Sequence, residues 1–178
     1  PKDYEVPKLD HKVDVFNLDL KHPELLMSNV LDVIPNLVLT DYFMYFTTEN
    51  LLLKPIDYAS YTNNKFYVPL TTIEDNNSYF EFEKTLHEFY SGDINTNTDM
   101  ILEYMICGAT DSSLWTEFNQ LSVKILNFFR QHRRQIESLY DPGLYCYIEP
   151  AADLVALNLL YQQGKYQFRN FPNAFMSM

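Results

Sequence analysis

One stretch of this chain repeats apolar residues at helical spacing for longer than any other, and it limits how the rest can fold. Its positions step by three or four residues for about seven turns. Asp111, Ser112 and Ser113 precede the stretch as capping residues, and Asp141 begins a strong turn signal after it. The sequence therefore predicts one helix over 112–140, long enough to run the length of a domain. The stripe consists of Leu114, Phe118, Leu121, Ile125, Phe128, His132, Ile136 and Leu139.

Further helices are expected where capping signals flank an apolar period. Pro35 is expected to stop the first of them, because an internal proline removes a hydrogen bond of the helix. Ser78 and Glu81 form a capping box, and Gly92 has the position of a glycine that ends a helix. The predicted helices cover 22–35, 78–92, 98–108 and 150–164, with Gly108 and Gly164 ending the last two.

Short apolar runs without this period are the candidates for strands. The run from 37 to 53 is strongly apolar, and its centre, 42–46, is an unbroken series of Tyr, Phe and Met. Periodicity does not separate a buried strand from a buried helix in such a run, and we favour a helix there. Residues 66–70 are expected to form a short strand, and residues 144–148 a buried short strand or an extended link.

These elements add up to a mainly α fold, with about six helices and two or three short strands in a single compact helical domain. Residues 1–12 are polar, charged and interrupted by prolines, and we expect an extended polar arm there. The helical domain is expected to cover 13–164. Residues 165–178 are expected to form an aromatic C-terminal segment that packs on the domain or on a partner.

The composition favours contact surfaces over phosphate or nucleic-acid chemistry. The chain has 14 Tyr and 13 Phe but only 4 Gly, which nearly excludes glycine-rich phosphate-binding loops. Its 24 Asp and Glu against 13 Lys and Arg give a net charge of −11. Direct nucleic-acid binding needs clustered cations and is not expected. An acidic surface suits a basic partner segment, although many acidic proteins have no basic partner.

Neither the cysteines nor the histidines form a recognisable catalytic or metal-binding pattern. Cys107 is expected in the last turn of an apolar helix, and Cys146 is expected to point into the core. His87 is expected to face solvent and to pair with Glu83, one helical turn away. His132 falls on the apolar stripe, where we expect a satisfied, partly buried histidine. We therefore predict no catalytic residue, no metal and no cofactor.

One cluster of positive charge goes against the acidic trend. Arg130, Arg133 and Arg134 lie three and four residues apart, so one helix face carries all three. Together they could form a fork for a carboxylate or phosphate group of a partner. The alternative is that they oppose the helix dipole and pair with Glu137 and other acids of this chain. Three arginines are too few for a nucleic-acid groove.

The C-terminal segment is the second candidate for partner binding. Tyr166, Phe168, Phe171 and Phe175 would be costly to leave exposed as one patch. They are expected either to fold back over the helices or to dock on a neighbouring subunit. We therefore name these four aromatic residues, together with the three arginines, as the candidate partner-binding residues.

The sequence predicts a non-catalytic protein–protein interaction domain of a larger multi-subunit assembly, eukaryotic or viral. The partner is expected to be another protein, and in the specific version of this hypothesis the partner has a basic segment. We expect an intracellular location, nuclear or cytoplasmic, because two cysteines make no disulfide framework. No membrane contact is expected, since no apolar run approaches the length that spans a bilayer.

Two alternatives are kept beside this hypothesis. The chain could be a small-molecule-binding or enzymatic helical domain with an aromatic-lined pocket. It could also be a homo-oligomeric scaffold in which the helix over 112–140 forms the dimer seam, which requires the apolar stripe to be buried between chains. The residues expected to line the pocket are Tyr42, Tyr45, Phe82 and Phe128.

Overall fold

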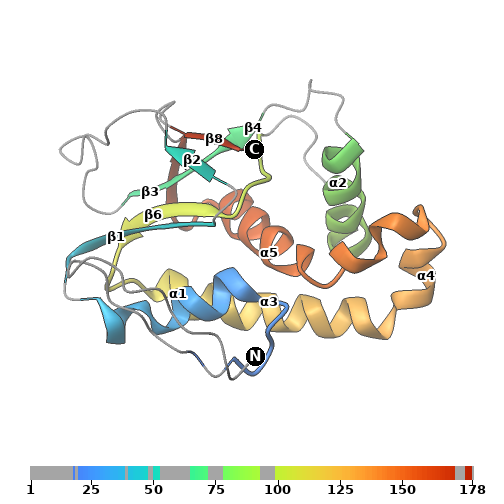
Figure 1. The fold of residues 1–178 in the computed structure, drawn as a ribbon, viewed down its shortest axis with the longest axis horizontal. Coiled ribbons are helices and arrows are strands. Elements are labelled where there is room, and N and C mark those ends of the chain that lie inside the picture. The colour runs from blue at the N-terminus through green and yellow to red at the C-terminus, as the bar shows by residue number, and fades with distance from the viewer. Residues whose placement is uncertain are drawn as a thin grey trace.

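A mixed α/β architecture emerges from the computed structural model, which describes residues 18, 20–38, 40–47, 50–52, 65–71, 78–92, 99–170 and 175–177 (Figure 1). The prediction of a mainly α fold is wrong, because strands recur along the chain and four of them form one sheet. In order, the elements are α1 (Leu26–Leu37), β1 (Tyr42–Phe46), β2 (Asn50–Leu52), β3 (Lys65–Val68), β4 (Leu70–Thr71), α2 (Ser78–Ser91), β5 (Met100–Ile101), β6 (Met105–Ala109), α3 (Ser113–Gln131), α4 (Arg133–Glu137), the 3-10 helix η2 (Pro142–Tyr147), α5 (Ala151–Gln162), β7 (Gln167–Asn170) and β8 (Phe175–Ser177).

The four-stranded sheet has the order β1-β6-β3-β7. Strand β6 runs antiparallel to both β1 and β3, whereas β7 runs parallel to β3. Two smaller antiparallel pairs, β2 with β8 and β4 with β5, complete the strand pairing of the described residues. The sheet therefore joins segments from both halves of the chain, and residues 167–170 form one of its outer strands.

Strand β1 occupies the run for which we favoured a helix. Its side chains alternate between two apolar environments, as in a strand buried on both faces. Phe43 meets Trp115 with the ring centroids 5.0 Å apart, and Tyr45 packs against the same main core. Met44 points the other way, into a second cluster with Met105 and Cys107. Apolar residues are therefore needed at successive positions of β1, so the sequence lacks the alternation of apolar and polar residues that would identify a strand.

Strand β6 overturns the predicted helix over 98–108 for the same reason. Ile106 lies in the main core, whereas Met105 and Cys107 lie in the second cluster on the opposite face. Gly108 does not end a helix. A Cβ built at this position would lie 2.5 Å from the Phe66 ring and 3.2 Å from Trp115, so the glycine allows the aromatic rings to approach the strand.

The long predicted helix is divided into two. It begins as expected, because the Ser112 hydroxyl accepts a hydrogen bond from the Leu114 amide at 3.2 Å. The helical conformation is interrupted at His132, whose φ of −105° and ψ of 14° separate α3 from α4. The apolar stripe nevertheless continues across the break, since Ile136 is fully buried. The chain thus changes direction at His132 and forms a corner.

Two helices with clear end signals are confirmed. Helix α2 starts at Ser78 and is followed by Gly92 with a φ of 78°, and α5 is followed closely by Gly164 with a φ of 67°. Pro35, in contrast, does not stop α1, which continues to Leu37. A proline in the last turn removes one hydrogen bond only, so the helix tolerates it there.

The remaining corrections concern short segments. Residues 66–70 contribute to β3 and β4, as predicted for a short strand. Residues 144–148 form neither a strand nor an extended link but lie largely in the 3-10 helix η2. Asp141 begins this helix by accepting a hydrogen bond from the Gly143 amide at 2.9 Å.

Helix α5 lies at the centre of the molecule (Figure 1). Nine of its twelve residues are buried, and it packs against α3 on one side and α2 on another. In Figure 1, α3 runs along the base with α1 beside it, the sheet lies above these two helices, and α4 forms the right-hand end. An almost fully apolar helix is expected only where neighbours surround it.

Candidate functional site

The predicted arginine cluster lies where α3 turns into α4. Arg130 Nη2 is 2.8 Å from Glu24 Oε1 and 2.8 Å from Glu149 Oε2. Arg133 Nε is 2.7 Å from Glu137 Oε1, and its Nη1 is 2.9 Å from Glu149 Oε1. The hydrogen bonds that Arg130 donates to Glu149 and that Arg133 donates to Glu137 raise the pKa of both guanidinium groups. Two of the three arginines therefore pair with acids of this chain.

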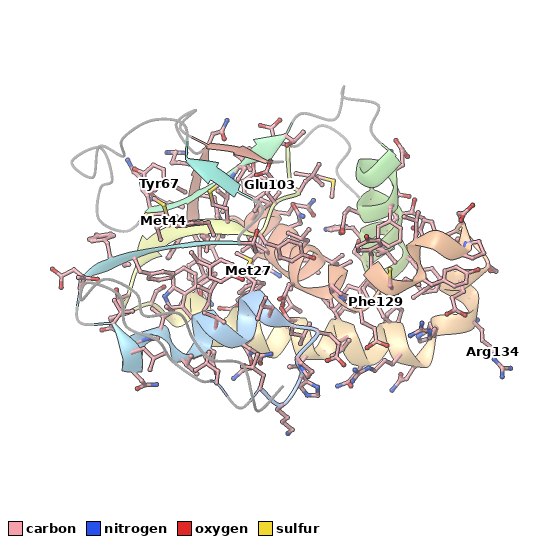
Figure 2. All side chains as sticks on the ribbon, viewed as in Figure 1. Met27, Met44, Tyr67, Glu103, Phe129 and Arg134 are labelled. Carbon is pink, nitrogen blue, oxygen red and sulfur yellow. The ribbon has the colours of Figure 1, made fainter. Side chains whose placement is uncertain are left out.

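The third arginine has a different environment. Arg134 is exposed and has no ion pair within the described part of the chain. Figure 2 shows its side chain at the outer end of the molecule, pointing away from the body. Residues 130–135 and Glu137 together line an open hollow of about 520 Å³. The three predicted arginines thus surround one surface feature, although only Arg134 is free of intramolecular ion pairs there.

Exposed apolar side chains adjoin this hollow in sequence. Leu139, which the sequence placed on the apolar stripe, is 53% exposed, and Tyr147 is 49% exposed. Among the described residues, Leu26 and Phe46 are the other large hydrophobic side chains with comparable exposure. We refer to residues 130–147 as the α4 corner. It brings three arginines and two half-exposed apolar side chains into a single stretch of chain.

Tyrosines hold the α4 corner against the rest of the molecule. The Tyr140 hydroxyl donates to the Phe82 carbonyl at 3.1 Å, and the two rings meet at 4.8 Å between centroids. The Tyr145 hydroxyl donates to the Glu137 carbonyl at 2.8 Å and so joins η2 to the end of α4. Burial raises the pKa of Tyr140 to about 12, so this hydroxyl stays protonated at neutral pH. Tyr140 therefore joins the corner to α2, and Tyr145 joins the two helices of the corner to each other.

Of the four candidate residues in the C-terminal segment, the structure describes the side chains of two, Tyr166 and Phe168. The Tyr166 hydroxyl donates to Glu117 Oε2 at 2.6 Å, and Lys165 pairs with the same carboxylate, which lowers the pKa of Glu117. Phe168 is buried in β7, with its ring 5.7 Å from that of Phe66. Phe171 lies outside the described residues. Phe175 begins β8, and its side chain is not described.

Tyr166 and Phe168 therefore pack within the chain. They secure the strand that follows α5, and they are not brought together with the three arginines. The arginines lie at the opposite end of α3 from Glu117, the residue that binds Tyr166. Of the two predicted clusters, only the arginine cluster forms a surface feature of the described chain.

The prediction that His87 faces solvent beside Glu83 is wrong. Both side chains are buried in α2, where burial lowers the pKa of His87 to about 4. His87 Nδ1 lies 3.2 Å from the Ser91 hydroxyl, which itself donates to the His87 carbonyl at 2.8 Å. The hydroxyl proton of Ser91 is thus used by the backbone, and this serine is not placed as a nucleophile activated by histidine.

A second buried polar group connects α5 to α1. Asp153 Oδ2 accepts hydrogen bonds from the amides of Met27 at 3.0 Å and Ser28 at 3.2 Å, the unpaired donors of the first turn of α1. Burial raises the pKa of Asp153 to about 6, although these amides and the hydroxyls of Ser28 and Ser122 act in the opposite direction. Asp153 therefore caps a helix distant in sequence, which is a structural role.

Cysteine and metal chemistry find little support in the described residues. Cys107 is buried, as expected, but in a strand, and burial raises its pKa to about 11. Cys146 is exposed on η2 and does not point into the core. No group of three or more His, Cys, Asp or Glu within the described ranges is arranged to hold a metal ion.

The residues expected to line an aromatic pocket do not converge. Tyr42 and Tyr45 lie an odd number of residues apart on β1 and so point to opposite faces of the sheet. Phe82 is fully buried against Tyr140. Phe128 packs against Tyr90, with the ring centroids 5.1 Å apart.

The expected dimer seam makes its contacts inside one chain. His132 Nδ1 lies 2.9 Å from the Phe128 carbonyl, and the His132 ring lies 4.2 Å from that of Phe128. Ile136 is fully buried without a second copy. All three residues therefore make contacts within one chain, although Phe128 and His132 are only partly buried.

Comparison of the chain with protein-family models, with curated proteins and with solved structures finds no match. In the part of the chain that the structure describes, no helix combines the length and the apolar character needed to cross a membrane.

Proposed function

We propose that this protein is a non-catalytic protein–protein interaction domain of a multi-subunit assembly and that the α4 corner is its docking surface. The observation that carries the proposal is the exposure of Leu139 and Tyr147 on a corner that Tyr140 and Tyr145 hold in place. Leucine and tyrosine side chains that are half exposed have apolar area left to bury against a partner. A surface that is already ordered loses less conformational entropy on binding.

The arginines add polar anchors in the same stretch of chain. Arginine and tyrosine are enriched among the residues that dominate binding energy at interfaces. Arg134 is exposed without an intramolecular ion pair in the described chain, and it lies in the same corner as Leu139. The corner therefore offers the mixture of apolar and cationic groups that suits a protein partner.

The proposed partner is a different protein and not a second copy of this chain. Leu114, Phe118, Ile125 and Ile136 of the apolar stripe are fully buried within one chain, so their burial does not require a second copy. Light scattering of the purified chain is expected to give a mass near 21.1 kDa at low and high concentration. A stable dimer would support the scaffold alternative.

Quantitative affinity purification tests the docking surface. The double variant Leu139→Ser/Tyr147→Ser removes the exposed apolar groups of the corner, and it should fold normally because both side chains are half exposed. We expect one or more proteins that co-purify with the wild-type chain from its source to be lost from the double variant.

A matched control comes from strand β1, outside the α4 corner. Phe46→Ser removes a side chain of similar exposure, 51%, from β1. Under the proposal, this variant retains the same co-purifying proteins. If the corner variant and the control behave alike, the α4 corner is not the docking surface.

A further inference from the structure

We infer that the α4 corner recognises an acidic segment of its partner, in which carboxylates stand next to large apolar side chains. This inference rests on the proposed function and names the chemistry of the partner at the same site. It departs from the basic partner segment that the net charge of the chain suggested, because the charge of the corner differs from that of the whole chain.

The charges of the corner are layered. Side-chain exposure is 44% for Arg133 and 37% for Arg130, against 31% for Glu24, 27% for Glu137 and 20% for Glu149. The two arginine side chains are therefore more exposed than the acids that they bind. A partner that approaches the corner meets the positive groups first, and this order favours an anion.

N–H groups of the three arginines that make no hydrogen bond within the described chain also favour an acidic partner. Arg130 binds its acids through Nε and Nη2, and Arg133 binds its acids through Nε and Nη1. Within the described chain, this leaves Nη1 of Arg130 and Nη2 of Arg133 without a hydrogen bond. All the donors of Arg134 are likewise unused by the described residues. Arginine has five N–H groups in a planar fork, so a paired arginine can still bind a further carboxylate.

The charge of the remaining surface makes the corner distinct. Arg130, Arg133 and Arg134 carry +3, and Glu24, Glu137 and Glu149, which pair with Arg130 and Arg133, carry −3, so these six residues together are neutral. The net charge of the whole chain is −11, so this excess lies entirely outside the cluster. The negative surface outside the cluster would repel an acidic segment, whereas the arginines of the corner would attract it. This difference directs the segment to the corner.

The apolar requirement comes from the same corner. Leu139 follows α4 and Tyr147 ends η2, and the hydrogen bond from Tyr145 to the Glu137 carbonyl joins the two elements. Both side chains expose about half of their surface. Surface ion pairs alone contribute little to affinity, so binding requires apolar side chains of the partner beside its carboxylates.

A peptide titration followed by NMR of the isotope-labelled full chain tests this inference. Three synthetic peptides of equal length serve as probes. The first has Glu and Asp around Phe and Leu, the second replaces each acid by Lys, and the third replaces Phe and Leu by Ser. We expect the first peptide to shift the amide signals of Arg134, Leu139 and Tyr147, the second to leave them unchanged, and the third to bind more weakly.

Variants assign the binding to its groups. Arg134→Glu is expected to weaken binding of the first peptide by about three- to tenfold. Arg169→Glu makes the same change of charge at an exposed position of β7 and is expected to have little effect. Added salt is expected to weaken binding, because it screens the arginine contacts.

The inference is overturned if the lysine peptide shifts the corner signals as strongly as the acidic one, or if the acidic peptide leaves them unchanged. Binding that strengthens with salt would also contradict it, because the overall charge would then dominate. These failures differ from failure of the proposed function. If a corner-dependent partner is found and its contacting segment is basic, the docking surface stands and the inference fails.

Discussion

Gly108 shows how a single residue constrains the packing of the sheet on α3. Its missing side chain leaves room for the Phe66 ring, which a Cβ would approach to 2.5 Å, and for Trp115 at 3.2 Å. Trp115 in turn donates a hydrogen bond from Nε1 to the Ala109 carbonyl at 2.9 Å. The Trp115 ring is therefore fixed by this hydrogen bond and by its packing near Gly108, and it has little freedom to move away.

Gly108→Ala is expected to destabilise the fold by about 1 to 3 kcal/mol, the usual cost of overpacking a well-filled core. Urea unfolding measures this change. Phe66→Leu provides the control, since a smaller side chain relieves the contact and the double variant should then lose less stability than the sum of the single variants. Strictly additive losses would show that the two residues do not compete for this space.

Asp153 is expected to make the fold more stable as the pH falls from 7 towards 4. Its pKa is about 6 in the folded protein against 3.8 for an ordinary aspartate, so the folded state binds its proton more tightly. This contribution is complete below pH 3.8 and is lost as the pH rises through about 6; the loss is about 3 kcal/mol. Asp153→Asn keeps an acceptor for the amides of Met27 and Ser28.

The Asp153→Asn variant should therefore gain stability over the wild type as the pH rises from 4 to 7. Urea unfolding of both proteins across this range measures the difference. A difference that does not change with pH would mean that the carboxyl group titrates normally.

His87 acts in the opposite direction over nearly the same range. Its pKa is lowered from 6.5 to about 4 by burial, so its contribution is complete above pH 6.5 and is lost as the pH falls through about 4. In the wild type, the two effects largely cancel. His87→Gln should unmask the Asp153 effect, so that this variant gains stability on acidification relative to the wild type. An unchanged pH profile would place the His87 ring in contact with solvent.

Single residues were predictable where local chemistry decides their role. The spacing of Arg130, Arg133 and Arg134 predicted one helix face, whereas the structure divides them between α3 and α4, although all three line one hollow; Glu137 was expected as a partner. The acids Glu24 and Glu149 come from distant segments, and no local pattern shows that they meet Arg130. His87 was wrongly assigned to solvent, because nothing in α2 alone indicates which neighbours cover it.

At the scale of elements, β5 illustrates a strand that depends on a side chain. Asn158 of α5 accepts a hydrogen bond from the Ile101 amide at 2.8 Å and donates one to the Ile101 carbonyl at 2.8 Å. The amide side chain thus takes the place of a neighbouring strand. All four groups are buried, so the loss of these bonds would leave polar groups of the backbone unpaired.

Asn158→Leu is expected to cost about 2 to 4 kcal/mol, because both backbone groups of Ile101 lose their partner. It should also remove the protection of the Ile101 amide against hydrogen exchange. Asn119→Ala is a matched control, since the Asn119 side chain makes a longer contact of 3.3 Å with Asn29 in a partly buried site. Equal losses in the two variants would show that Asn158 does not anchor β5.

Elements with their own end signals were predictable from sequence, and those fixed by tertiary contacts were not. Helices α2 and α5 are each followed by a glycine with a positive φ, and both were correctly predicted. Strands β1 and β6 are apolar on both faces, so their pattern is compatible with a buried helix. The break at His132 lies within an uninterrupted apolar stripe. Ile136 would be expected on the buried face of one continuous helix and is also buried in the observed α4, so the stripe gives no sign of the break.

At the scale of the whole molecule, the fold separates a covered core from an exposed corner. Helix α5 is surrounded by α2, α3 and the strands, whereas the α4 corner extends from one end (Figure 1). This corner was not predictable as a surface, because Leu139 continues the apolar stripe and Tyr147 belongs to an apolar run. Their exposed fractions of 53% and 49% show that these side chains face outward.

Photo-crosslinking from the α4 corner tests the central claim most directly. A benzophenone amino acid replaces Tyr147, which is 49% exposed, and the same group replaces Lys124, an exposed residue on the middle of α3, as the control. The chain is expressed in its source and irradiated, and crosslinked proteins are identified by mass spectrometry. The account predicts a specific protein crosslinked at position 147 and absent at position 124. Equal crosslinking at the two positions, or none at 147, would contradict it.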